Sequence, residues 1–335
     1  MRYDSKTNSA SGDAIAAPAM RFQRTLEPGN YQVKITFSVP IPNSLTIGVE
    51  NVPTQRFRST EKYDNHIIKG TITQGASGEI VFDVAVIDGV FDLEFIGDTR
   101  GGVQFETFAN NIEISRLPAK TRSPKPTVYI MGDSTVASYA ATDIMAGWGQ
   151  KLGKLLGSHI NVDNRAIGGR STRSFYREGR LEEVLLSLKP GDLALVQFGH
   201  NDGSHNKDER YVSNQDYEML LTDYYIKGVK QRGGIPVIVT PVPRHGFRSA
   251  TTHDSYVASA KKAARLGGAF LIDAHNLALS HYNSLPGTET EKQVVLDSYY
   301  ILDKKGGSDH THFTKAGAAK MAEIIYSELA RLKLV

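Results

Sequence analysis

Hydrophobic and polar residues alternate along the first third of the chain, as expected of short strands with one buried face. In Tyr31–Phe37, Tyr, Val, Ile and Phe alternate with Gln, Lys and Thr. Turns rich in Gly, Pro and Asn separate further runs of this kind at 45–49, 80–86, 91–95 and 112–114. Short strands in this arrangement predict an antiparallel β-sandwich. We expect it to span residues 1–118.

The pattern changes beyond Leu117. Residues 119–126 contain prolines and basic residues without apolar periodicity, which predicts a linker. Short apolar runs then alternate with stretches of helical period, which predicts a parallel sheet covered by helices on both faces over residues 127–335. The expected strands lie near 128–131, 160–167, 193–198, 235–242 and 270–273. The expected helices lie near 148–156, 181–188, 217–231, 256–266 and 315–334.

The composition excludes several kinds of functional site. The 335 residues suggest two domains at roughly 100 to 200 residues each. The chain has no cysteine, which excludes disulfides, thiolate metal sites and a cysteine nucleophile. No apolar run has the length of a membrane span, and residues 1–20 show no targeting signal. We expect neither a membrane nor a nucleic acid as a partner, and the oligomeric state is not set by the sequence.

Charge is divided unevenly between the two parts. Through Leu117 there are 11 Lys and Arg against 14 Asp and Glu, a balance of −3, whereas the remainder has 28 against 22, or +6. Nine of the ten histidines also lie in the second part. We therefore expect the chemistry, and any attraction for anions, in the second part.

Four loops at the carboxyl ends of the expected strands carry the candidate chemistry, since functional loops leave an open parallel sheet at that edge. A neutral imidazole can take a proton from a hydroxyl while a carboxylate on its other nitrogen fixes the tautomer, and Asp309 and His312 can form that pair. Each loop alone has an ordinary explanation as a helix cap or a turn. The four are Gly132-Asp133-Ser134, Asn164–Ser171 with its paired glycines, Gly199–Asp202 and Asp309–His312.

The order of these blocks resembles the SGNH (GDSL-like) hydrolases. The strings GDSTVASY, GWGQKL, NRAIGGRSTRSFYREGR and DHTHFTKAG are similar to the rhamnogalacturonan acetylesterases of carbohydrate esterase family 12. The resemblance covers Thr127 to the C-terminus. It implies Ser134 as nucleophile, His312 as base and Asp309 as its orienting partner. It further implies an oxyanion hole formed by the backbone amides of Ser134 and Gly169 and the side chain of Asn201.

The same resemblance implies a three-layer α/β/α sandwich with a five-stranded parallel sheet, no metal and no cofactor. It also implies ester substrates, here acetylated pectic polysaccharide, and a secreted or periplasmic location. The N-terminal sandwich is similar to galactose-binding-like modules. A purely structural appendage is an equally good interpretation of it.

Candidate substrate-binding residues are Trp148, Arg170, Arg173 and His200. If the stretch after Gly169 is helical, Arg170, Arg173, Arg177 and Arg180 lie near one face and can hold galacturonate carboxylates. The alternative is an internally paired face, because Glu178, Glu182 and Glu183 are close in sequence. Trp148 can stack on a sugar ring, orient the loop beside Ser134, or simply pack in the core.

Three other functions compete with this one. A metal-dependent hydrolase can draw ligands from six Asp and His side chains. A sugar-binding protein without catalysis predicts that mutating Ser134 leaves ligand affinity intact and that no acetate is released. An acetylesterase acting on xylan or on oligosaccharides uses the same mechanism on another polymer. The six candidate metal ligands are Asp309, His310, His312, Asp202, His200 and His205.

Overall fold

A computed structural model describes residues 2–4, 9–11, 15–16, 19–37, 45–50, 67–72, 78–97, 106–107, 109–246, 254–302 and 309–335. By its internal contacts the chain divides into two compact units. The first is Met1–Lys120 with Tyr176–Ser187, and the second is Thr121–Phe175 with Leu188–Val335. The sequence analysis places Tyr176–Ser187 in the second domain, whereas its contacts belong to the first unit.

The first unit consists of antiparallel strands. One sheet has the order β1-β2-β11-β5-β8, another the order β4-β9-β6-β7, and β10 pairs with β3. The predicted alternation is present: on β5, Val33 and Ile35 are fully buried. The strands are β1 (Arg2–Asp4), β2 (Ser9–Ser11), β3 (Ile15–Ala16), β4 (Ala19–Thr25), β5 (Gly29–Phe37), β6 (Leu45–Val49), β7 (Ile67–Ile72), β8 (Gly78–Val86), β9 (Val90–Gly97), β10 (Glu106–Thr107) and β11 (Ala109–Arg116).

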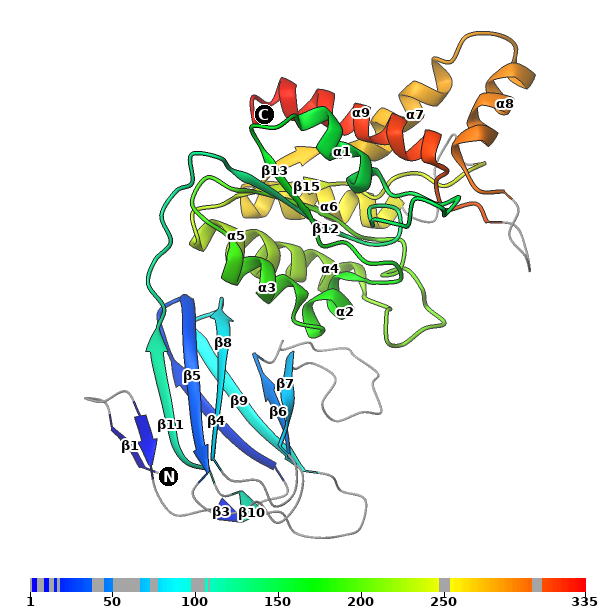
Figure 1. Ribbon diagram of the computed structural model, residues 1–335. Helices are drawn as coiled ribbons and strands as arrows, with labels where there is room; N and C mark the ends of the chain where they lie inside the picture. The colour runs from blue at the N-terminus through cyan, green and yellow to red at the C-terminus, as the bar shows by residue number, and fades with distance from the viewer. Residues whose placement is uncertain are drawn as a thin grey trace. The chain divides into compact units, whose positions relative to one another are not determined.

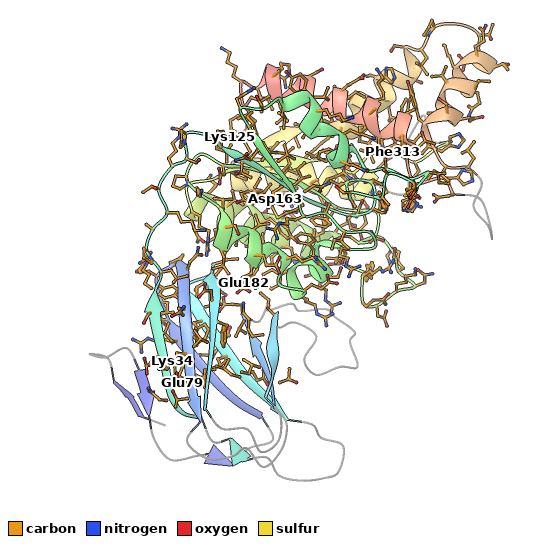
Figure 2. The ribbon with its side chains drawn as sticks, viewed as in Figure 1. Lys34, Glu79, Lys125, Asp163, Glu182 and Phe313 are labelled. Carbon is orange, nitrogen blue, oxygen red and sulfur yellow. The ribbon has the colours of Figure 1, made fainter. Side chains whose placement is uncertain are left out.

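Neighbouring strands of the larger sheet are also joined through their outer faces. Lys34 of β5 lies 2.6 Å from Glu79 of β8, and both are labelled in Figure 2. Such a cross-strand pair on a solvated face adds little stability. The buried apolar rows of β5, β6, β8, β9 and β11 therefore hold this unit together.

A helix from later in the chain completes the first unit. Helix α3 (Arg180–Ser187) contacts β8, and its Glu182 is buried. The Glu182 carboxylate accepts the backbone N–H of Ala85 at 3.2 Å and pairs with the Lys69 ammonium. Burial raises the pKa of Glu182, and Lys69 opposes that rise. The carboxylate thus ties α3 to two strands of this unit.

The second unit is built on the predicted five-stranded parallel sheet, in the order β13-β12-β14-β15-β16 (Figure 1). Its central strands β12 and β14 are almost wholly buried, which explains their continuous apolar sequences. The fold class predicted for this part is confirmed. The strands are β12 (Thr127–Gly132), β13 (Asn161–Asn164), β14 (Leu193–Gln197), β15 (Ile235–Val239) and β16 (Phe270–Ile272).

Helices cover both faces of this sheet. Figure 1 shows α1 and α9 on one face and α4 and α5 on the other. Helices α7 and α8 contact α9, while α6 contacts α4 and β15. The helices are α1 (Trp148–Leu156), α2 (Thr172–Arg177), α4 (Asn214–Met219), the π-helical η1 (Leu220–Ile226), α5 (Lys227–Gln231), α6 (Asp254–Gly267), α7 (Ala274–Asn283), α8 (Glu289–Tyr299) and α9 (Lys315–Arg331). None of the helices formed by the described residues is long and apolar enough to cross a membrane.

Candidate active site

The candidate loops meet because parallel strands end at the same edge of the sheet. At the end of β12 the chain turns sharply at Gly132, where a Cβ atom would lie 2.7 Å from the Gln197 carbonyl oxygen. Only glycine fits so close to the neighbouring strand. Ser134 follows two residues later and keeps 9% of its surface exposed. The turn therefore presents the serine at the edge where the other loops arrive.

Ser134, His312 and Asp309 form a continuous hydrogen-bonded chain. The Ser134 Oγ lies 2.8 Å from His312 Nε2, and His312 Nδ1 lies 2.6 Å from Asp309 Oδ2. Asp309 Oδ1 also accepts the backbone N–H groups of Thr311 and His312. With the Nδ1 proton held by the carboxylate, His312 Nε2 is the atom free to accept the serine proton.

The loops that meet at this edge of the sheet also carry the expected oxyanion-hole donors. Within the described part of the chain, the backbone N–H groups of Ser134 and Gly169 have no acceptor. Gly169 has a φ of 81°, a conformation that favours glycine. Asn201 donates one amide N–H to the Arg170 carbonyl at 3.1 Å. Unpaired donors are uncommon in folded proteins, and such groups can stabilise an oxyanion.

Comparison with known proteins identifies the family. The model of the GDSL-like lipase/acylhydrolase family matches residues 130–320, which include all four loops. The chain belongs to this family. The resemblance drawn from the sequence motifs is therefore confirmed.

Individual relatives are similar to this acylhydrolase over different shares of its chain. The probable rhamnogalacturonan acetylesterase YesY of Bacillus subtilis (strain 168) is 37% identical over 210 residues, 62% of this chain and 94% of YesY. The uncharacterized esterase YxiM of the same strain is 30% identical over 333 residues, 96% of this chain and 80% of YxiM. A crystal structure of YxiM matches with a TM-score of 0.54 and 25% identity, covering 99% of this chain and 92% of that one.

A buried polar network supports the nucleophile loop of this acylhydrolase. Trp148 Nε1 donates to Gln197 Oε1 at 2.7 Å, and Gln197 Nε2 donates to Thr135 Oγ1 at 2.7 Å. Thr135 in turn donates its hydroxyl and its backbone N–H to Asp133. Trp148 has no exposed surface. The predicted stacking of Trp148 on a sugar is therefore wrong, and its role is to fix Gln197 beside the loop that carries Ser134.

His200 belongs to the same network rather than to the substrate surface. Its Nδ1 lies 3.3 Å from Asp133 Oδ2 and its Nε2 lies 3.0 Å from the Val242 carbonyl oxygen. Both ring nitrogens thus face oxygen atoms inside the protein. Burial alone would raise the pKa of Asp133, but His200 brings it below its usual value. His200 is buried, so the predicted substrate contact is wrong here too.

The predicted row of arginines does not exist as one helical face. Helix α2 ends at Arg177, and Gly179, with a φ of 72°, separates it from α3. Arg173 is 3% exposed and donates to the Asp208 carbonyl at 3.1 Å. Arg170 bends back to the Gly168 carbonyl at 3.0 Å, and Arg180 pairs with Glu178. The internally paired alternative thus describes these residues better than a carboxylate-binding row.

Two side chains that the sequence analysis does not select hold the catalytic loops. Tyr139 donates its hydroxyl to the Ser134 carbonyl at 2.8 Å. His245 donates its backbone N–H to the His310 carbonyl at 2.8 Å, and its ring stacks on that of His310. Asp297 of α8 accepts from His245 Nε2 at 2.7 Å. These partners are 52 and 65 residues apart along the chain, so no local motif signals them.

The candidate metal ligands are distributed over different contacts. Asp309 binds His312, which faces Ser134, while His200 faces Asp133. The ring of His205 packs on that of Tyr211, with 4.4 Å between the ring centroids. Among the residues that the structure describes, no three His, Asp or Glu side chains gather as a metal-binding group.

Proposed function

We propose that this acylhydrolase is a serine esterase that removes acetyl groups from pectic polysaccharide, with rhamnogalacturonan as its substrate. The observation that carries the proposal is the hydrogen-bonded chain from Ser134 through His312 to Asp309, together with backbone N–H groups that have no acceptor among the described residues. This arrangement provides a nucleophile, a base and a site for an oxyanion, the three groups that acyl transfer needs.

The reaction begins at Ser134. Its Oγ attacks the carbonyl carbon of the acetyl ester while His312 Nε2 takes the hydroxyl proton, as the 2.8 Å contact allows. Asp309 stabilises the imidazolium that forms. The negative charge on the former carbonyl oxygen is stabilised by the N–H groups of Ser134 and Gly169 and by the amide of Asn201.

Collapse of the tetrahedral intermediate breaks the ester bond. His312 gives its proton to the departing sugar oxygen, so the sugar leaves as an alcohol and Ser134 stays acetylated. Water then attacks the acetyl-enzyme, again giving a proton to His312. The second intermediate releases acetate as the proton returns to Ser134 Oγ, which restores the free enzyme.

The name of YesY supports a rhamnogalacturonan ester as substrate. The balance of +6 beyond Leu117 is a separate physical reason, since a net positive charge attracts an acidic polymer more than neutral xylan. Such polymers are too large to enter a cell, and we infer that the enzyme acts in a secreted or periplasmic location. Fractionation of the source cells with an antibody against the protein tests that location.

Released acetate tests the activity and the substrate together. The purified protein is incubated with acetylated rhamnogalacturonan, acetylated xylan and nitrophenyl acetate, with Ser134→Ala protein as the matched control. We expect acetate from all three with wild-type protein, fastest from rhamnogalacturonan, and a loss of several orders of magnitude in Ser134→Ala. Faster acetate release from xylan than from rhamnogalacturonan would show that xylan is the preferred polymer. Equal release by Ser134→Ala would refute serine catalysis.

A further inference from the structure

Arg244 lies between two residues that are fixed to the catalytic loops. The Val242 carbonyl binds His200, which pairs with Asp133, and the backbone N–H of His245 binds the carbonyl of His310. The loop that follows β15 is therefore fastened at both sides of Arg244. Its guanidinium starts from a fixed backbone position at the same edge of the sheet as Ser134.

This guanidinium has no hydrogen-bonded or ion-paired partner among the residues that the structure describes. Within the described residues, Arg244 makes no hydrogen bond or ion pair, and its Nε is buried without an acceptor. Burial lowers the pKa of Arg244, while the carboxylates of Asp133 and Asp309 oppose that change. A partly buried cation normally has a paired anion, because removing an unpaired charge from water costs free energy. Asp133 and Asp309 are not ion-pair partners of Arg244, since their carboxylates bind His200 and His312.

A second guanidinium lies on another loop of the site. Arg210 Nη2 lies 3.3 Å from the position that a Cβ atom on Gly169 would occupy, so the guanidinium packs directly on that backbone. Arg210 pairs with the carboxylate of Glu209 at 3.6 Å, and the Glu209 side chain is 63% exposed. An exposed pair at that distance holds the arginine weakly. Arg210 is thus free to engage a ligand beside the candidate oxyanion donor.

We propose that Arg244 and Arg210 bind a carboxylate of the substrate and select acetyl esters on acidic sugars. Guanidinium groups match carboxylates in charge and in the geometry of their paired N–H donors. A uronate residue next to the acetylated sugar would supply the anion that Arg244 lacks. The inference rests on the proposed function and replaces the arginine row from Arg170 to Arg180, whose members are buried or paired with other groups.

Discrimination between acidic and neutral substrates tests the proposal. We compare kcat/KM on acetylated rhamnogalacturonan oligosaccharides with that on acetylated xylo-oligosaccharides for wild type, Arg244→Gln, Arg244→Lys and Arg210→Gln. The acidic-to-neutral ratio should fall about 10- to 100-fold in Arg244→Gln, the usual effect of losing a charge-assisted hydrogen bond. It should fall less in Arg210→Gln, and Arg244→Lys should recover part of it because the charge is retained.

Arg265→Gln is the matched control, since Arg265 is exposed in the last turn of α6, before β16 and away from the carboxyl ends of the strands. Its ratio should equal that of the wild type. An equal loss on acidic and neutral substrates in Arg244→Gln would overturn the proposal, because Arg244 would then act on the catalytic residues. If Arg244→Gln does not fold, an unchanged ratio in both Arg244→Lys and Arg210→Gln would likewise overturn it.

Inhibition separates this inference from the proposed function. Unacetylated oligogalacturonate should inhibit hydrolysis of nitrophenyl acetate by the wild type, and its inhibition constant should rise about 10-fold or more in Arg244→Gln. If the wild type shows this inhibition but releases no acetate from rhamnogalacturonan, the proposed polymer is wrong and the carboxylate site stands. If acetate is released but oligogalacturonate inhibits both proteins equally, the proposed function stands and the site is wrong.

Discussion

Asn201 is a residue whose role can be measured apart from substrate binding. One of its amide N–H groups binds the Arg170 carbonyl, and the other has no acceptor among the described residues. Asn201→Ala removes this donor from the developing oxyanion, so we expect a loss of about 100- to 1000-fold, mostly in kcat. Steady-state kinetics on nitrophenyl acetate measure it. A change confined to KM would mean that Asn201 only holds substrate.

Asp202, the next residue, links stability to pH. It is fully buried and accepts hydrogen bonds from Thr172 and from the Gly199 backbone. The pKa of Asp202 is raised from 3.8 to about 7, mainly because the carboxyl group is buried. The folded protein therefore holds a proton that the unfolded chain releases near pH 4. The contribution of this proton to the free energy of unfolding is fully present below pH 3.8 and is lost as the pH rises through about 7.

Urea unfolding of wild type and Asp202→Asn between pH 5 and pH 8 tests this linkage. The variant cannot titrate at this position, so its free energy of unfolding should decline less over that range. The difference in slope should approach about 1.4 kcal/mol per pH unit below pH 7, the value for one proton. Parallel curves for the two proteins would show that Asp202 does not titrate in this range.

At the scale of elements, helix α8 positions the catalytic loop. Its Asp297 holds the His245 ring, with Gln293 Nε2 donating to the same carboxylate at 2.6 Å. His245 in turn binds His310, and the backbone N–H of Ile301, just after α8, binds the His312 carbonyl at 2.9 Å. The hydrogen bond from His245 keeps the pKa of Asp297 below its usual value. The contact thus favours the charged form of the Asp297 carboxylate.

Breaking this contact should misplace His312 without removing a reacting group. We expect His245→Ala and Asp297→Asn each to lower kcat about 10- to 100-fold with a smaller change in KM, the scale of a displacement near 1 Å. The double variant should lose little more than either single variant, because both act through one contact. His159→Ala, in an exposed turn before β13, is the control and should keep full activity. Additive losses in the double variant would contradict the shared contact.

Elements were predictable from the sequence where they bury a regular apolar face. Helix α1 has the predicted bounds Trp148–Leu156 and buries Trp148, Leu152 and Leu156. Helix α8 was not predicted, because Leu296 is its single buried residue and its sequence lacks a helical stripe. The candidate triad and Gly169 were identified from motif order. His245 with Asp297, and the burial of Arg173, depend on folding and leave no local pattern.

At the scale of the whole molecule, each of the two units is built from two separate stretches of the sequence. Tyr176–Ser187 belongs to the first unit, although sequence on both sides of it belongs to the second. Ser134, Gly169, Asn201 and the catalytic pair lie in the second unit. A fragment of residues 121–335 would thus keep every proposed catalytic group and lose the strands that α3 contacts.

We expect this fragment to fold and hydrolyse nitrophenyl acetate, but to inactivate at a lower temperature than the full chain. In the fragment, Glu182 loses Lys69 and the backbone of Ala85, and removing the partner of a buried charge typically costs about 3–5 kcal/mol. Lys69→Met in the full chain should lower the inactivation temperature in the same direction, since it breaks that pair without removing a strand. Activity remaining after a ten-minute incubation at a series of temperatures compares the three proteins. A fragment as heat-resistant as the full chain would show that α3 needs no support from the strands. A folded but inactive fragment would show that the first unit completes the active site.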